Sequence, residues 1–211
     1  MIKKFFKFAI HNSQAGMTYV ELIVVLSIFA TMTSVVLFNY NAFQEKVDIK
    51  ILATDIASKI VEAQKSAMAG KINSASNGIL NWKPSYGVYF DSPVSGNNQD
   101  FVYFTDLDSS HDYTDASFCS FPGTGECLDK IHITKNNRIL NMKVFYTDGT
   151  PTATSTFDNL SINFTRPDSG ANIKLPYLST VNMSYVQITV SSPSGMTANV
   201  NVYPSGRIQI N

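Results

Sequence analysis

The first 70 residues fall into three stretches that differ in their pattern of hydrophobic and polar positions. Residues 1–16 carry three lysines and no acidic residue, whereas residues 22–44 hold no charge at all. From residue 45 to 69, apolar side chains recur at three- and four-residue steps, which indicates one face of an amphipathic helix. Gly70 then offers a natural C-terminal stop. We therefore predict a helix over residues 17–69, roughly 80 Å long at 1.5 Å per residue.

After Gly70 the pattern shortens to an alternation of apolar and polar residues, which is typical of half-buried strands. Stretches rich in Pro, Gly, Ser, Asp and Asn separate the runs and predict turns. The expected strands cover residues 86–90, 101–104, 131–134, 141–146, 160–164, 186–190 and 198–202. The pattern predicts an α+β protein in which an antiparallel β-sheet packs against the long helix.

The uncharged run is long enough to cross a bilayer, and the lysines before it predict a cytoplasmic N-terminus with the C-terminal part outside. We expect a single-pass protein of the cytoplasmic membrane. The predicted organisation is a leader (1–16), a membrane-spanning helix (17–44), its amphipathic continuation (45–70) and a β-rich head (71–211). With 14 Phe and 10 Tyr among 211 residues, disorder along the whole chain is excluded.

Two features of the N-terminus are unusual for an export signal. A secretory signal places its small-residue cleavage site after the apolar run, but here Gly16 precedes the run. Glu21 lies within the apolar helix itself, where insertion of a carboxylate costs about 2.5–3.5 kcal/mol. Such a residue needs a partner and indicates a function. The alternative is a plain signal anchor whose Glu21 happens to lie near the membrane interface.

The run Gly16-Met17-Thr18-Tyr19-Val20-Glu21, followed by an apolar segment, resembles the class III signal of type IV pilins and pseudopilins. The resemblance implies that prepilin peptidase cuts between Gly16 and Met17 and that the new N-terminus is methylated. Glu21 is then the fifth mature residue, and its carboxylate would pair with the Met17 amine of a neighbouring subunit during assembly. Two departures are that Met17 replaces the family's usual Phe and that Phe38 stands where many members have Pro.

Segments of the β-rich part resemble the H-type pseudopilins and FimT-like minor pilins. They are Tyr86-Gly-Val-Tyr-Phe-Asp91, residues 101–108, Leu160-Ser-Ile-Asn-Phe-Thr165 and the closing Ser205-Gly-Arg-Ile-Gln-Ile210. Each is weak alone, and their order carries the likeness. It implies a minor subunit of a hetero-oligomeric filament, either a type IV pilus-like fibre or a type II secretion pseudopilus at the cell surface. The implied partners are prepilin peptidase, other pilins or pseudopilins, a membrane platform protein and an assembly ATPase.

Cys119 and Cys127 are the only cysteines, and the expected orientation exposes them to an oxidising compartment. We predict a disulfide between them, the alternative being two free thiols. A short loop of this kind gains about 2–3 kcal/mol from closure in the chain-entropy model.

Asp106, Asp108, Asp112 and Asp115 crowd one loop, and oxygen-rich loops of this kind can bind calcium. The favoured interpretation is a solvated polar loop without a metal, since the spacing departs from an EF-hand. We therefore expect no cofactor, with calcium as the alternative.

No nucleophile motif appears, and we expect no enzyme activity. Without the leader, thirteen basic residues face sixteen acidic ones, which disfavours nucleic acid as a partner. The alternative to a structural subunit is a binding module at a filament tip, either an adhesin or a DNA-uptake minor pilin. An exposed basic or aromatic patch on the β-rich part would favour that alternative.

Overall fold

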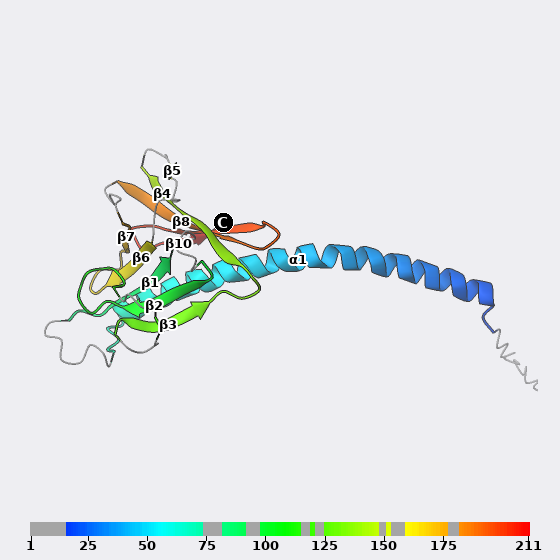
Figure 1. The fold of residues 1–211 in the computed structure, drawn as a ribbon, viewed down its shortest axis with the longest axis horizontal. Coiled ribbons are helices and arrows are strands. Elements are labelled where there is room, and N and C mark those ends of the chain that lie inside the picture. Colours follow the sequence, from blue (N-terminus) through cyan, green and yellow to red (C-terminus); the bar gives the residue numbers. More distant parts are fainter. Residues whose placement is uncertain are drawn as a thin grey trace, which may run out of the picture. The chain divides into compact units, whose positions relative to one another are not determined.

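The computed structural model describes residues 16–73, 82–91, 98–114, 119–120, 125–147, 151–152, 159–176 and 182–211. The chain divides into two units, residues 1–43 and 44–211, and we describe each by itself. One helix, α1 (Tyr19–Met68), runs through the boundary between them (Figure 1). The predicted helix is confirmed, and its ends lie within two residues of the expected positions.

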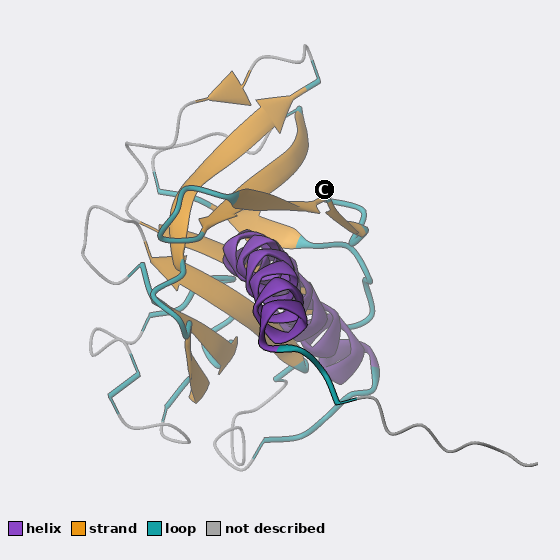
Figure 2. Ribbon diagram, turned by 90° about the vertical axis from the view of Figure 1, so that its right-hand side faces the viewer, coloured by secondary structure: helices purple, strands orange, loops and turns teal. Residues whose placement is uncertain are grey.

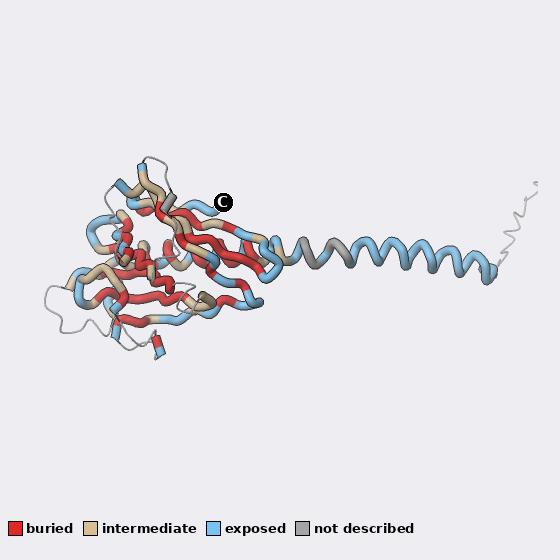
Figure 3. Tube along the Cα trace, turned by 45° about the horizontal axis from the view of Figure 1, so that its top comes forward, coloured by how far each residue is buried: buried red, intermediate tan, exposed pale blue. Residues whose placement is uncertain are grey.

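In the first unit, the described side chains of α1 are mostly apolar, and they are exposed (Figure 3). The segment Tyr19–Leu37 has a mean hydropathy of 2.3, and none of it is buried. By length and composition it is able to cross a membrane. Within the described residues it is the one helix that meets this test.

The C-terminal end of α1 is closed by Gly70. The Lys71 N–H donates to the Ser66 carbonyl at 3.1 Å, and the Gly70 N–H donates to the Ala67 carbonyl at 3.0 Å. These two bonds define a Schellman motif, in which the residue after the cap takes a left-handed conformation. Gly70 has a φ of 66°, so the stop predicted from sequence rests on a backbone shape that glycine adopts without strain.

The second unit contains two antiparallel five-stranded sheets. Their orders are β3-β2-β1-β6-β7 and β10-β9-β8-β4-β5 (Figures 1 and 2). The strands are β1 (Ser85–Asp91), β2 (Asp100–Thr105), β3 (Cys127–His132), β4 (Arg138–Tyr146), β5 (Pro151–Thr152), β6 (Asn159–Thr165), β7 (Asn172–Lys174), β8 (Met183–Ser191), β9 (Thr197–Val202) and β10 (Ile208–Ile210). The α+β class is confirmed, but the strands form two sheets where the sequence pattern had indicated one.

The core of this unit lies between α1 and both sheets. Ile49, Ile56, Ile60 and other apolar residues of one helix face are almost fully buried against side chains from both sheets. Each large aliphatic side chain buried in this way contributes about 1.5–3 kcal/mol. The apolar residues that recur at three- and four-residue steps in the sequence therefore form the face by which α1 packs on both sheets.

Strand β1 is buried along its whole length because it is covered on both faces. Tyr86, Val88 and Phe90 face the core with α1, whereas Tyr89 belongs to a second apolar cluster on the opposite face. That second cluster also contains Val102, Phe104, Tyr113, Cys119 and Cys127. Tyr113 and Cys119, from the chain between β2 and β3, thus pack on the outer face of the first sheet.

Candidate functional site

Helix α1 begins at Tyr19, directly after the three residues Gly16, Met17 and Thr18. The Thr18 hydroxyl accepts a hydrogen bond from the Glu21 N–H at 3.3 Å, and the Thr18 carbonyl accepts one from the Leu22 N–H at 3.1 Å. Thr18 is therefore the N-cap of the helix. The cap fixes the start of the helix two residues after Met17, and Met17 itself is 61% exposed.

Glu21 lies in the first turn of α1, and its side chain is exposed. A carboxylate at this end of a helix interacts favourably with the partial positive charge of the unpaired N–H groups. Among the residues that the structure describes, no cation or side-chain donor pairs with the Glu21 carboxylate. Within that part of the chain, the charge of Glu21 is available for a partner.

The hydroxyl groups within the apolar segment bond back to the helix. Ser27, Thr31 and Thr33 donate to the carbonyls of Val24, Ile28 and Phe29, at 2.8, 2.9 and 2.8 Å. Polar groups in an apolar medium need such internal partners. These three hydroxyls can therefore enter a lipid or protein interior without losing hydrogen bonds.

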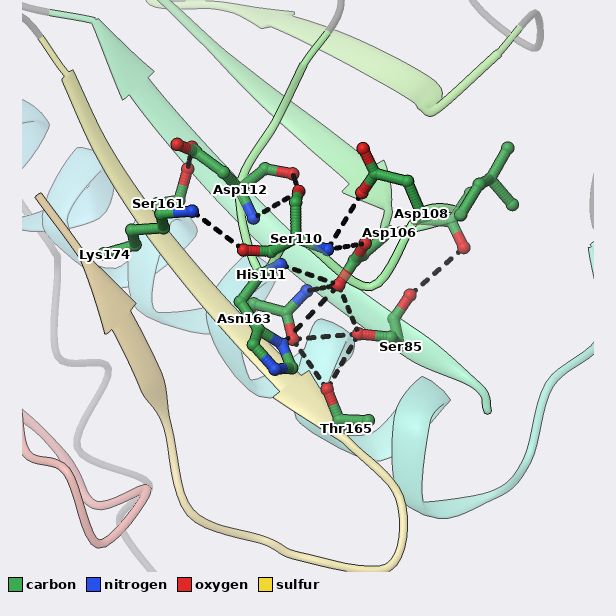
Figure 4. A network of polar contacts seen from close by, with 12 residues as sticks. Ser85, Asp106, Asp108, Ser110, His111, Asp112, Ser161, Asn163, Thr165 and Lys174 are labelled. Carbon is green, nitrogen blue, oxygen red and sulfur yellow. Dashed lines mark hydrogen bonds and ion pairs between the residues drawn. The ribbon is translucent and has the colours of Figure 1, made fainter. Parts of the chain in front are cut away.

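A second group of polar side chains surrounds Asp106, which follows β2 and is fully buried (Figure 4). Its carboxylate accepts the backbone N–H of Ser110 at 3.2 Å and that of His111 at 3.1 Å. The Ser85 hydroxyl on β1 and the Asn163 amide on β6 lie 3.3 and 3.4 Å from Oδ2. This one carboxylate therefore fixes the loop after β2 to the two strands beside it.

Asp106 and Asp108 form a pair whose pKa values shift in opposite directions. Burial raises the pKa of Asp106, the hydrogen bond to Asp108 and the charge of Glu126 add to the rise, and the His111 N–H opposes it. For Asp108 burial acts upward as well, but hydrogen bonds from Ser110 and Asp106 outweigh it and lower its pKa. As pH rises, Asp106 therefore loses its proton at a higher pH than Asp108 does.

Glu126 completes this network, and sequence analysis missed it. It precedes β3 and is buried, and its two oxygens accept the Leu107 N–H at 3.1 Å and the Thr114 N–H at 2.9 Å. Carboxylate oxygens of Asp106, Asp108 and Glu126 lie within 4.8 Å of one another. The sequence could not indicate that Glu126 belongs to this group, because it lies 18 residues after Asp108 and no motif links the two. Only the contact in the folded structure shows it.

The structure separates the four aspartates that the calcium alternative grouped together. Asp106 and Asp108 lie together with Glu126, whereas the Asp112 carboxylate accepts hydrogen bonds from Ser161 and from the Tyr113 N–H. Asp115 lies outside the described residues. The carboxylate oxygens that a cation near Asp106 would bind already accept hydrogen bonds from backbone N–H groups. These hydrogen bonds stabilise the conformation of the loop after β2.

Cys119 and Cys127 form a disulfide, with Cα atoms 5.5 Å apart. Both cysteines are buried in the second apolar cluster, beside Phe104 and Tyr113. The bond and the carboxylate network hold the same segment between β2 and β3, one through apolar contact and the other through hydrogen bonds. The sequence prediction of this disulfide agrees with the structure.

We expect the double substitution Cys119→Ser and Cys127→Ser to lower the free energy of unfolding by about 2–3 kcal/mol, because the unfolded chain gains the freedom of an open loop. Urea titration of the full chain in detergent, followed by the fluorescence of Trp82, measures the change. Trp82 is the only tryptophan, and its indole N–H donates to the Asp106 carbonyl at 2.7 Å. An unchanged unfolding midpoint would show that the disulfide does not stabilise this segment.

A second expectation concerns pH. A raised folded-state pKa at Asp106 means that its stabilising contribution is complete at low pH and is lost as pH rises through that pKa. The lowered pKa of Asp108 acts in the opposite sense, because its contribution is lost as pH falls. The stability of the natural chain relative to Asp106→Asn should therefore fall as pH rises from 4 to 7. The exposed Asp129→Asn is the control, and a difference that is constant with pH would contradict this assignment.

Comparison of the chain with protein-family models, with curated proteins and with solved structures finds no match. The function is therefore inferred from the residues themselves. The N-terminal segment offers a capped, apolar helix whose one carboxylate has no partner among the residues that the structure describes. The network around Asp106 and the disulfide tie the described residues between β2 and β3 to the first sheet.

Proposed function

We propose that this protein is a structural minor subunit of a type IV pilus-like filament or a type II secretion pseudopilus. The observation that carries the proposal is the order of features at the N-terminus. A basic leader ends at Gly16, Glu21 follows five residues later, and an uncovered apolar helix begins between them and continues into the core of a β-rich unit.

The first step is processing. Prepilin peptidase cuts after Gly16 on the cytoplasmic side of the membrane, and the new N-terminal amine of Met17 is methylated. Met17 is exposed and lies just before the Thr18 cap, so cleavage removes no hydrogen bond of the helix. The mature chain starts almost at the first turn of α1.

The second step is assembly. The uncovered segment Tyr19–Leu37 rests in the membrane before assembly and packs against the same segment of other subunits afterwards. The Glu21 carboxylate pairs with the Met17 amine of a neighbour, which neutralises both charges in an apolar surrounding and sets the axial register. A membrane platform protein and an assembly ATPase drive this transfer. The protein has a structural and not a catalytic task.

A second candidate function, a binding module at a filament tip, is favoured by an aromatic row on the outer face of the second sheet. Phe145 and Tyr185 stack with centroids 4.5 Å apart, Tyr203 lies 5.3 Å from Tyr185, and Arg207 covers the Tyr203 ring at 3.8 Å. Each of the three rings thus contacts another ring of the row, and Arg207 also lies over Tyr203. Because the aromatic side chains already contact one another and Arg207, less of their surface is left for a ligand, which weakens this candidate relative to the structural one.

Deletion of the gene separates the two candidates. A structural subunit predicts loss of surface filaments, or of the secretion that depends on them, with recovery when the natural chain is restored. Intact filaments with lost attachment or DNA uptake would instead favour the tip module. Complementing the deletion with the Tyr185→Ala variant gives a matched test. If the protein is a structural subunit, this variant should restore filaments; if it is a tip binding module, attachment should stay defective.

A further inference from the structure

A groove runs between α1 and the free edge of β10. Two adjoining cavities of about 830 and 710 Å³ form it, and they share Thr54 and Ile210 in their walls. We call it the α1–β10 groove. One wall is the helix face from Lys46 to Ala69, and the other is β10 with the turn before β9. At 1.5 Å per residue the helical wall is roughly 35 Å long.

In the part of the chain that the structure describes, the edge of β10 leaves backbone groups unpaired. Asn211 and Asn199 exchange hydrogen bonds at 2.9 and 3.0 Å, and the Tyr203 N–H donates to the Arg207 carbonyl at 2.9 Å. In an antiparallel ladder the paired residues alternate with residues whose N–H and C=O groups point away from the partner strand. Ile208 and Ile210 are those alternate residues, and no backbone group among the described residues pairs with their outward side.

The floor of the groove is apolar and its rim is basic. Ala57, Val61 and Ile208 line the floor, and Ile210 is 41% exposed beside them. Lys46, Lys50, Lys65 and Lys71 line the rim, and the acidic residue there, Glu62, is paired with Lys59 at 3.1 Å. The rim is therefore positively charged, although the mature chain as a whole has more acidic than basic residues. Lysines beside an open edge repel non-specific strands, and the same lysines select an acidic one.

We propose that the α1–β10 groove binds an extended, acidic segment of another protein, which adds as a strand to β10 and lays alternate apolar side chains on the floor. Strand addition obtains affinity from main-chain hydrogen bonds and specificity from alternate side chains. About ten residues at 3.3 Å each span the groove. The proposal does not depend on filament assembly, because the groove belongs entirely to the second unit.

The test uses the full chain in detergent and a labelled, capped ten-residue peptide of alternating Glu and Val, with binding measured by fluorescence anisotropy. We expect the acidic peptide to bind and the matching Lys and Val peptide to bind at least tenfold more weakly. A version N-methylated at alternate residues cannot donate to the edge and should lose binding. Equal binding of the basic peptide, or undiminished binding of the N-methylated one, would overturn the proposal.

Two variants locate the site. Ile210→Pro removes an outward N–H without touching the bonds to β9. The pair Lys50→Glu and Lys65→Glu leaves two lysines against two new glutamates, which cancels the positive excess of the rim. Each should weaken binding at least tenfold, whereas Lys143→Glu on β4 should change it less than twofold. If Ile210→Pro does not fold, the N-methylated peptide still decides the question. If the natural chain associates with itself and Ile210→Pro abolishes this association, the groove binds a second copy of the chain. That result would overturn the proposal of an acidic partner.

Discussion

Glu21→Val should lower the amount of the protein in surface filaments at least tenfold, while its amount in the membrane stays the same. In the assembly proposed above, the substitution would leave the Met17 amine of each neighbour without a counter-charge among apolar side chains, and the loss of one partner of a buried ion pair costs about 3–5 kcal/mol. Immunoblots of sheared and membrane fractions measure the two amounts. The Thr18 cap survives, because it binds the backbone N–H of Glu21 and not the carboxylate.

Thr31→Val is the matched control for this experiment. It exchanges a hydroxyl for a methyl group in the same apolar segment, and that hydroxyl bonds only within its own helix. We expect this variant to reach the sheared fraction normally. If Glu21→Val did so as well, the carboxylate would have no assembly role, and the plain signal anchor would account for the N-terminus.

The second large effect is expected at Gly87, in the middle of β1. A Cβ atom there would lie 2.6 Å from the Ile162 carbonyl oxygen of β6 and 2.6 Å from the Phe104 ring of β2. The carbonyl belongs to the backbone of the paired strand, so the space opens only if the sheet separates. Overpacking of a core typically costs 1–3 kcal/mol. We expect Gly87→Ala to lose about that much free energy of unfolding, and Gly87→Val to lose more.

Urea titration followed by Trp82 fluorescence measures this loss in the full chain in detergent. Gly125→Asn is the control, because its Cβ would meet no atom within 4 Å and its φ of 58° suits asparagine. We expect the control to change stability by less than about 1 kcal/mol. A Gly87→Val chain as stable as the natural one would show that the close packing of Phe104 over β1 is not required.

The helix and most of the strands could be predicted because their signals are local. The three- and four-residue spacing and the Gly70 stop placed α1 within two residues at each end, and alternation located β1, β2, β4, β6, β8 and β9. The predicted strand at residues 131–134 was misplaced, because β3 ends at His132 and begins at Cys127. The short strands β5, β7 and β10 were missed, since two or three residues carry no period.

The division into two sheets and the network around Asp106 could not be predicted for a different reason. Both depend on contacts between residues far apart in the chain, such as Ser85 with Asn163 at 2.9 Å and Leu107 with Glu126. The need for glycine at position 87 follows from the burial of β1 on both faces, which the local sequence does not show. The disulfide was predictable because only one pair of cysteines exists.

Mass spectrometry of the N-terminal peptide, from membrane and sheared-surface fractions, tests the central claim most directly. We expect a mature chain that begins at N-methylated Met17 and is present in the sheared fraction. A chain that still carries Lys3, Lys4 and Lys7, or one that is cut after the apolar segment, would contradict the filament assignment.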